Sequence, residues 1–269
     1  MSIVTISRGT FSGGKMLAEC LAERLGFRCI DRDVIVERAA ASGVSQEELR
    51  DALQKPPSFL ERFQHKKYMY LALIQAALAE EVRTGRVVYH GNAGHLLLAG
   101  GNPVLRVRII APLEFRLKMA QDRLKFSRNE ALAYIEKMDE HRRKWTHYLY
   151  GVDWGDPTLY DLVLNLEHIS VEEACNVLVA TVRERCFTLT PQCQVRMNDL
   201  AISSRVRANL ALNPPTSGLE VEVTATEGRV RIRGRLAGLE QLEEVRRVAT
   251  NSRGVVEVNL QELSLTAHS

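Results

Sequence analysis

The sequence predicts an α/β fold with a parallel sheet, followed by a small α+β domain of αββαβ order. Three observations support this prediction. Strand patterns alternate with helical patterns up to about residue 186, an order that favours parallel strands joined by right-handed crossovers. The glycine-rich stretch GTFSGGK separates the first strand from the first helix. Beyond about residue 198, the pattern becomes helix, hairpin, helix and strand.

The first part is expected to open with a strand at 3–6 and a helix that ends at Gly26, where glycine favours a left-handed C-cap. Further strands are expected at 27–35 (a strand and its turn), 86–91, 103–112 and 160–165. Further helices are expected at 42–54, 66–85, 113–126, 127–145 and 170–185. Capping boxes support the last two, in the pairs Ser127 with Glu130 and Ser170 with Glu173.

The second part follows a stretch without clear periodicity, FTLTPQCQVRMN. We therefore expect domains at 1–186 and 198–265, with a linker at 187–197. The expected elements of the second domain are a helix at 199–212, a hairpin at 218–236, a helix at 238–252 and a strand at 254–263. Arginines at alternate positions of the hairpin share one face, where they would meet a phosphate-bearing ligand or, as the favoured interpretation, water: Arg229, Arg231, Arg233 and Arg235.

Composition narrows the classes of protein. The chain has 269 residues, 45% of them hydrophobic, which is enough for two packed domains. A net charge of +3 is too small to argue for a nucleic-acid partner, and none is expected. Five cysteines without a C-x-x-C pair favour neither a disulfide framework nor a zinc site. With no signal-like segment and no apolar run of membrane-spanning length, we expect a soluble cytoplasmic protein, and the oligomeric state stays open.

The glycine-rich stretch fits G-x-x-x-x-G-K-[ST], a loop whose backbone N–H groups surround phosphates, except at its last position. Met16 stands where a serine or threonine would bind Mg²⁺, and a thioether is a poor ligand for that ion. No side chain is assigned firmly to the metal, although Ser12 is a possible ligand. The residues expected to bind the nucleotide are Gly9, Thr10, Ser12, Gly13, Gly14, Lys15 and Met16.

Four strings make the first part resemble the cytidylate kinase-like family of P-loop nucleoside monophosphate kinases: IVTISRGTFSGGK, IDRDVI, APLEFRLKMAQDR and YGVDWGDPTLYDLVLN. The resemblance implies the three-layer fold of P-loop kinases and the use of ATP and Mg²⁺. It also implies transfer of a phosphoryl group to a nucleoside monophosphate, with a CMP-like acceptor favoured. The second part resembles a BON domain, which implies a small ligand or a phospholipid as its partner.

The resemblance also implies roles for individual residues. Catalytic charge stabilisation is assigned to Lys15 and three arginines of a lid, with Asp139 orienting them: Arg116, Arg142 and Arg143. The arginines would otherwise lie on solvated helix faces, where charge pairs at three or four residues' spacing are common. Asp31 and Arg32 are assigned to the acceptor, although the Asp-Arg-Asp run also fits an ordinary solvated turn.

One departure concerns the acceptor. Cytidylate kinases have Gly-Arg-Asp where this chain has Gly91, Asn92 and Ala93, so Asn92 takes the acceptor-binding position. Together with Met16, this departure keeps two alternatives open: a catalytically weak nucleotide-binding regulator that signals through the second domain, and a kinase for another small substrate.

Overall fold

The protein was analysed as a computed structural model, which describes residues 2–54, 64–91, 93–99, 104–188 and 190–265. A five-stranded parallel sheet forms the centre of the larger part, in the spatial order β2-β3-β1-β4-β5. Its strands are β1 (Ile3–Arg8), β2 (Arg28–Asp31), β3 (Val87–His90), β4 (Val104–Ile110) and β5 (Leu162–Asn165).

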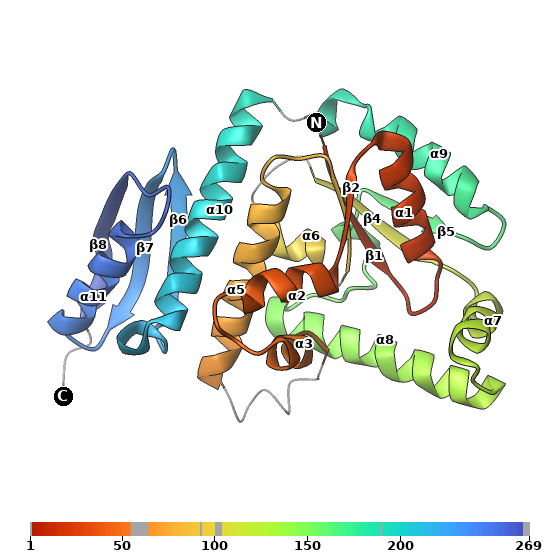
Figure 1. The fold of residues 1–269 in the computed structure, drawn as a ribbon, viewed down its shortest axis with the longest axis horizontal. Coiled ribbons are helices and arrows are strands. Elements are labelled where there is room, and N and C mark those ends of the chain that lie inside the picture. The colour runs from red at the N-terminus through yellow and green to blue at the C-terminus, as the bar shows by residue number, and fades with distance from the viewer. Residues whose placement is uncertain (1, 55–63, 92, 100–103, 189, 266–269) are drawn as a thin grey trace.

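Helices cover both faces of this sheet (Figure 1). One face carries α1 (Gly14–Leu25) and α9 (Val171–Val182). The other carries α2 (Arg32–Ala40), α3 (Gln46–Gln54), α5 (Gln64–Val82) and α6 (Gly94–Leu97). Each face forms its own hydrophobic core. Successive strand residues point to opposite faces, so Val4 lies in the core with α1 and α9, and Ile3 lies in the core with α2, α3, α5 and α6. The predicted three-layer α/β fold is confirmed.

Two further helices lie beyond the carboxyl ends of the strands: α7 (Leu113–Leu124) and α8 (Arg128–Tyr150). Both predicted capping boxes are present, one at the start of α8 and the other at the start of α9. The short 3₁₀ turns η2 (Pro157–Leu159) and η3 (Arg185–Phe187) precede β5 and follow α9. Since ligands of open parallel sheets bind outside the carboxyl ends of the strands, α7 and α8 are placed to cover such a ligand.

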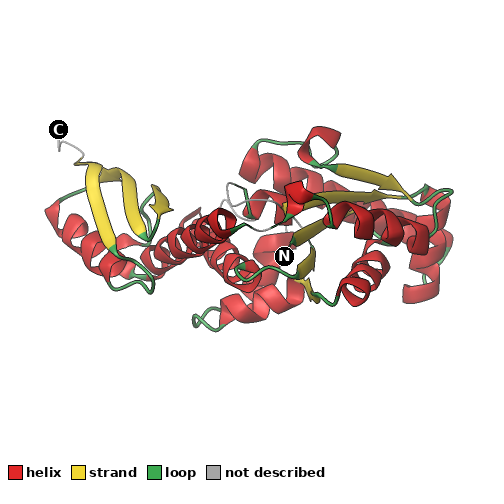
Figure 2. Cartoon of the chain, turned by 90° about the horizontal axis from the view of Figure 1, so that it is seen from above, coloured by secondary structure: helices red, strands yellow, loops and turns green. Residues whose placement is uncertain are grey.

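The second part packs three strands on helices, as the αββαβ prediction expected (Figure 2). Its elements are α10 (Pro191–Leu212), the turn η4 (Pro214–Thr216), β6 (Val221–Thr226), β7 (Arg229–Leu236), α11 (Leu239–Thr250) and β8 (Glu257–Leu265). Strand β7 lies in the middle, antiparallel to β6 and parallel to β8.

Two predicted segments have a different structure. The expected linker at 187–197 is helical from Pro191, because the Thr190 hydroxyl caps the helix and proline suits its first turn. The expected turn after β2 is α2, which Asp31 caps. Helix α10 runs alongside α5 and also packs on β6, so it belongs to both parts (Figure 1).

The arginines of β7 lie on the outer face of the small sheet, and three are paired with glutamates of neighbouring strands. Their nitrogens lie 3.5–3.8 Å from carboxylate oxygens in Arg229–Glu257, Arg231–Glu262 and Arg233–Glu222. The opposite charges of these exposed pairs neutralise each other, which is typical of a solvated face. A small ligand or phospholipid for this domain stays a prediction. Within the described ranges, no helix has the length and apolar character needed to cross a bilayer.

Candidate active site

The glycine-rich loop connects β1 to α1 with no room for side chains at two positions. Gly13 has φ +85°, and a Cβ there would lie 2.9 Å from the Leu166 Cδ1. A Cβ on Gly14 would lie 2.6 Å from the Cδ of Arg8. The loop backbone lies so close to its neighbours at both glycines that a side chain would not fit. It leads directly into the N-terminus of α1. This geometry suits close approach of a phosphate.

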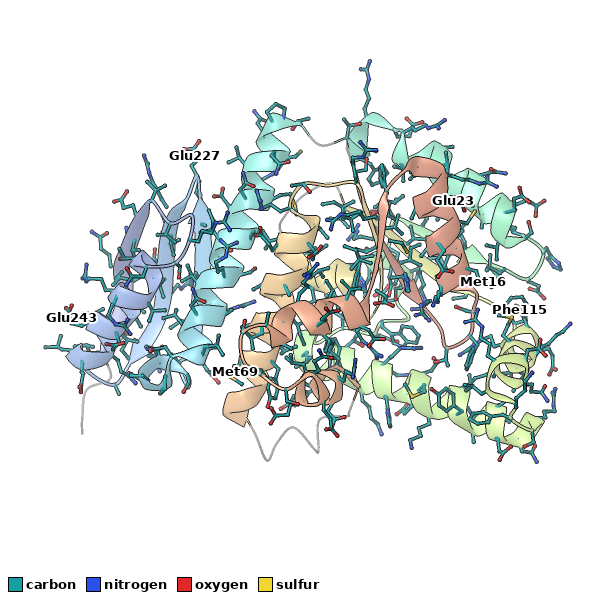
Figure 3. The ribbon with its side chains drawn as sticks, viewed as in Figure 1. Met16, Glu23, Met69, Phe115, Glu227 and Glu243 are labelled. Atoms are coloured by element: carbon teal, nitrogen blue, oxygen red, sulfur yellow. The ribbon has the colours of Figure 1, made fainter. Side chains whose placement is uncertain are left out.

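The side chains of the loop have separate tasks. The Ser12 hydroxyl lies 3.0 Å from the Gly9 carbonyl oxygen and 3.2 Å from that of Ile109, so it ties the loop to β4. The Lys15 ammonium is half exposed, 3.7 Å from Glu19 one turn further along α1. Met16 is 39% exposed at the loop end of α1, on which it is labelled in Figure 3. The thioether therefore lies at the surface and is not part of the core.

A carboxylate of α8 binds the loop. Asp139 Oδ1 accepts hydrogen bonds from the Thr10 backbone N–H at 3.0 Å and from the Thr10 hydroxyl at 2.7 Å. The same carboxylate pairs with Arg142 at 2.9 Å and with Arg116. Arg142 also donates to the Thr10 hydroxyl, and the Arg116 Nε donates to the Thr10 carbonyl at 2.8 Å. The loop, α7 and α8 thus meet around one acidic side chain.

This cluster is largely removed from water, since the side chains of Asp139, Arg116 and Arg142 are each only 16–17% exposed. Burial lowers the pKa of Arg142 to about 10, against the opposing effect of Asp139, so the guanidinium keeps its charge at neutral pH. Two cations and one anion leave the cluster with excess positive charge. Such a surplus in a dry site attracts an anion strongly.

Arg143 does not join the cluster. Its guanidinium pairs with Glu140 at 2.7 Å and is 58% exposed. Adjacent residues of a helix point about 100° apart, so Arg142 and Arg143 cannot both face the loop. The structure therefore brings together Arg116, Arg142 and Asp139 of the predicted lid set and leaves Arg143 on the solvated face.

Two residues predicted to bind an acceptor, Asp31 and Arg32, have partners within the protein. Asp31 caps α2, since its Oδ1 accepts from the backbone N–H groups of Asp33 and Val34 at 2.9 and 3.0 Å. Arg32 lies 3.6 Å from the Asp33 carboxylate. Burial and the nearby Arg32 charge both lower the pKa of Arg8, so these two cations are neighbours at the strand ends. Asn92 lies outside the described residues.

A second network was missed by the analysis of the sequence. Arg108 is 9% exposed in β4, donates to the Trp154 carbonyl at 2.6 Å and stacks 4.1 Å from the centre of the indole ring. The Tyr160 hydroxyl donates to the same carbonyl at 2.8 Å. The centre of the Trp154 ring also lies 5.9 Å from the Cζ of Arg142. A charged residue inside the apolar string PVLRVRIIAP was the available signal for Arg108.

The cavity between these groups is small in this conformation. It measures about 10 Å³ and is bordered by Ser7, Arg8, His95, Arg142 and Trp154, among others. His95 borders it and His90 is buried at the end of β3, and burial lowers the pKa of each to about 4, so both are neutral at pH 7. No group of three or more potential metal-binding side chains occurs among the described residues. The cleft is closed in this conformation and is too small for a phosphate.

A model of the cytidylate kinase-like family matches residues 3–168, which include the loop, the Asp139 cluster and the Arg108 network. The chain belongs to the cytidylate kinase-like family. A model of the BON domain matches residues 198–264. The family region ends before α9, and the intervening residues of α9 and of the first turns of α10 lie outside both matches.

Relatives of this cytidylate kinase-like chain include proteins named cytidylate kinase. The one from Ignicoccus hospitalis is 32% identical over 168 residues, 61% of this chain and 90% of its own length. That from Staphylothermus marinus is 27% identical over 178 residues, 65% of this chain and 94% of its own length. An uncharacterized protein from Eubacterium ventriosum has a crystal structure that matches 69% of this chain and all of its own, at a TM-score of 0.50 and 17% identity, which shows the shared fold.

Proposed function

We propose that this protein transfers the γ-phosphoryl group of ATP to a nucleoside monophosphate, with CMP the favoured acceptor. The observation that carries the proposal is the convergence of Thr10, Arg116 and Arg142 on one carboxylate oxygen pair. These groups donate to an internal anion and would donate equally well to phosphate. The membership of the cytidylate kinase-like family and the relatives named cytidylate kinase support the same reaction.

The chain supplies the requirements of phosphoryl transfer, which are alignment, charge neutralisation and exclusion of water. Backbone N–H groups of the loop and the N-terminus of α1 would hold the phosphates of ATP. Lys15 would turn from Glu19 toward the outer phosphates, because its exposed pair with that residue is weak. Arg116 and Arg142 would stabilise charge on the transferring group once it displaces Asp139.

The residues present fit ATP and fit Mg²⁺ less well. Gly13 and Gly14 leave the loop backbone open to phosphates. The hydroxyls of Ser12 and Thr10 are already hydrogen bonded, and Met16 offers no oxygen. Phosphate oxygens and water would therefore hold the ion, since Mg²⁺ retains several waters in such sites.

For the acceptor, we propose Arg8 and Arg108 in addition to Arg32. Arg8 and Arg108 extend from the neighbouring strands β1 and β4. Arg8 is partly buried and borders the closed cavity, and Arg108 is buried against Trp154, which also borders it. A monophosphate placed there would face the γ-phosphate held by the loop, which is the in-line arrangement that the reaction needs.

The test is a panel of ribo- and deoxyribonucleoside monophosphates incubated with ATP and Mg²⁺, with ADP and the diphosphate product measured by chromatography. Transfer to CMP or another pyrimidine monophosphate is expected. Lys15→Ala should abolish it, whereas Lys118→Ala, which changes an exposed lysine of α7, should not. Binding of ATP without transfer to any member would favour the regulator, and transfer only to a different small hydroxyl or phosphate compound would favour the third alternative.

A further inference from the structure

A groove lies between the two parts of the molecule, bordered by α10, by β6, by Gln75 of α5 and by Ala99. It has a volume of about 450 Å³. Polar side chains that line it include Gln75, Arg196, Ser203, Ser204, Arg207 and Thr224. An adjoining cavity of about 370 Å³ shares Gln75 and Arg207 and reaches Tyr150, the last residue of α8. Figure 1 shows α10 between α5 and the small sheet, where this groove lies.

Arg207 is the unusual member of the lining. Its side chain borders both cavities, and burial lowers the pKa of its guanidinium. Across the described ranges, this guanidinium forms no ion pair and no hydrogen bond. Arg205, two residues earlier on α10, instead pairs with Glu80 at 2.6 Å and donates to the Arg253 carbonyl at 2.7 Å. A partly buried cation without an anion is costly, so the charge of Arg207 is available to a ligand.

The carboxylate in the groove does not neutralise Arg207. Asp199 accepts hydrogen bonds from the backbone N–H groups of Glu227 and Gly228, each at 2.9 Å, and so holds the β6–β7 turn. Glu220 borders the adjoining cavity, which makes that side less suitable for an anion. The groove on the Asp199 side also carries Arg196, three helical turns from Arg207 on the same helix. Positive charge therefore predominates there.

We propose that this groove binds a small soluble organic phosphate, with Arg207 as its anchor and Arg196 as a second cation. Its volume lies within the range of sites for small molecules, about 300–1,000 Å³. The hydroxyls of Ser203, Ser204 and Thr224 supply short-range hydrogen-bonding groups between the two cations. A ligand there would contact both parts of the chain. Its anchor Arg207 also borders the adjoining cavity, which reaches Tyr150 at the end of the helix that carries Asp139 and Arg142.

The test uses the full chain and inorganic pyrophosphate, with hydrogen–deuterium exchange to locate binding. Slower exchange is expected in 196–207 and 221–226, and it should require at least about tenfold more pyrophosphate in Arg207→Gln, the loss expected when one charged hydrogen-bonding partner is removed. Arg246→Gln, which removes an exposed arginine of α11, should behave as the wild type. Protection confined to the glycine loop, or equal protection in Arg207→Gln, would overturn the proposal.

Two further measurements separate the alternatives. Removing an uncompensated charge should leave the unfolding temperature of Arg207→Gln unchanged or raise it, so a clear decrease together with unchanged pyrophosphate binding would assign the residue to structure and overturn the proposal. Vesicles of phosphatidylglycerol and phosphatidylcholine test a lipid headgroup as the source of phosphate. Sedimentation of the protein with the vesicles, dependent on Arg207 and without any response to free pyrophosphate, would overturn a soluble ligand.

Discussion

Asp139 binds Thr10 twice through one oxygen, accepting from its backbone N–H at 3.0 Å and from its hydroxyl at 2.7 Å. The carboxylate thereby takes donors of the glycine loop that the phosphates of a nucleotide would need. It also holds Arg116 and Arg142 together. In the proposed function, the same side chain would both orient the arginines and compete with the nucleotide.

Asp139→Asn separates these two effects. We expect the free energy of unfolding to fall by about 2 kcal/mol, because two largely buried guanidinium groups lose their counter-ion. Affinity for ATP should rise, while turnover should fall because the arginines lose their orientation. Chemical denaturation, calorimetric titration of ATP and the transfer assay measure the three quantities. Glu140→Gln, at the next residue, is the control, and lower ATP affinity in Asp139→Asn alone would contradict the competition.

Gly14→Ala tests the close contact between the loop and Arg8. A Cβ at Gly14 would lie 2.6–2.7 Å from the Arg8 side chain, which must then shift. We expect a loss of about 1–3 kcal/mol in the free energy of unfolding, as for other overpacked sites, together with weaker ATP binding. Gly238→Ala is the matched control, because a Cβ there meets no atom within 4 Å. Equal stability of the two variants would show that the loop backbone has room to adjust.

Met16→Ser tests how magnesium is held. The serine would add a hard oxygen at an exposed position, so half-maximal transfer should need less Mg²⁺ than in the wild type. Met16→Ala shortens the side chain without adding oxygen and should leave the Mg²⁺ requirement as it is. The measurement is a titration of Mg²⁺ in the transfer assay at fixed ATP. An identical Mg²⁺ requirement in the serine and alanine variants would exclude position 16 from the metal site.

His95 is expected to make stability depend on pH. Burial lowers its pKa from 6.5 to about 4, and the nearby Arg106 and Arg108 charges act in the same direction. The folded protein then binds fewer protons than the unfolded chain between these values, so the free energy of unfolding falls as the pH falls through this window, by about 2 kcal/mol at pH 5.

His95→Gln removes this dependence, and denaturation at pH 7 and pH 5 measures it. The wild type should lose more stability than His95→Gln over this interval, whereas His168→Gln, at an exposed position, should lose as much as the wild type. Equal losses of stability in the wild type and His95→Gln would show that His95 is protonated as readily in the folded protein as in the unfolded chain.

Local signals explain how much of the fold the sequence predicts. Capping pairs such as Ser127 with Glu130 act within one turn, so the starts of α8 and α9 could be predicted without tertiary contacts. Two equally local signals were misinterpreted. Thr190 and Pro191 mark the start of α10, where a linker was expected, and Asp31 marks the start of α2, where a turn was expected. The linker prediction relied on hydrophobic periodicity, which is weak at this end of α10, and overlooked the cap.

The site was less accessible to such signals. The glycine loop is contiguous in the sequence, and its spacing indicates the phosphate-binding role by itself. The choice of Arg142 over Arg143 depends on the rotation of α8 about its axis, and that rotation goes with the tertiary packing of buried residues such as Ile135 and Trp145. The stacking of Arg108 on Trp154 joins segments that are 46 residues apart, and no pattern in either string predicts that contact.

Helix α10 also determines how strictly the two parts are aligned. Its 22 residues begin beside α5 and continue under β6, so one rigid rod fixes the angle between the parts. Inserting one residue midway would turn the C-terminal sheet by about 100° about the helix axis, whereas inserting four would leave it only about 40° from its original orientation and displaced by about 6 Å. The orientation of the small domain thus depends on the number of residues in α10. In relatives that keep the groove, the length of α10 should differ by whole helical turns.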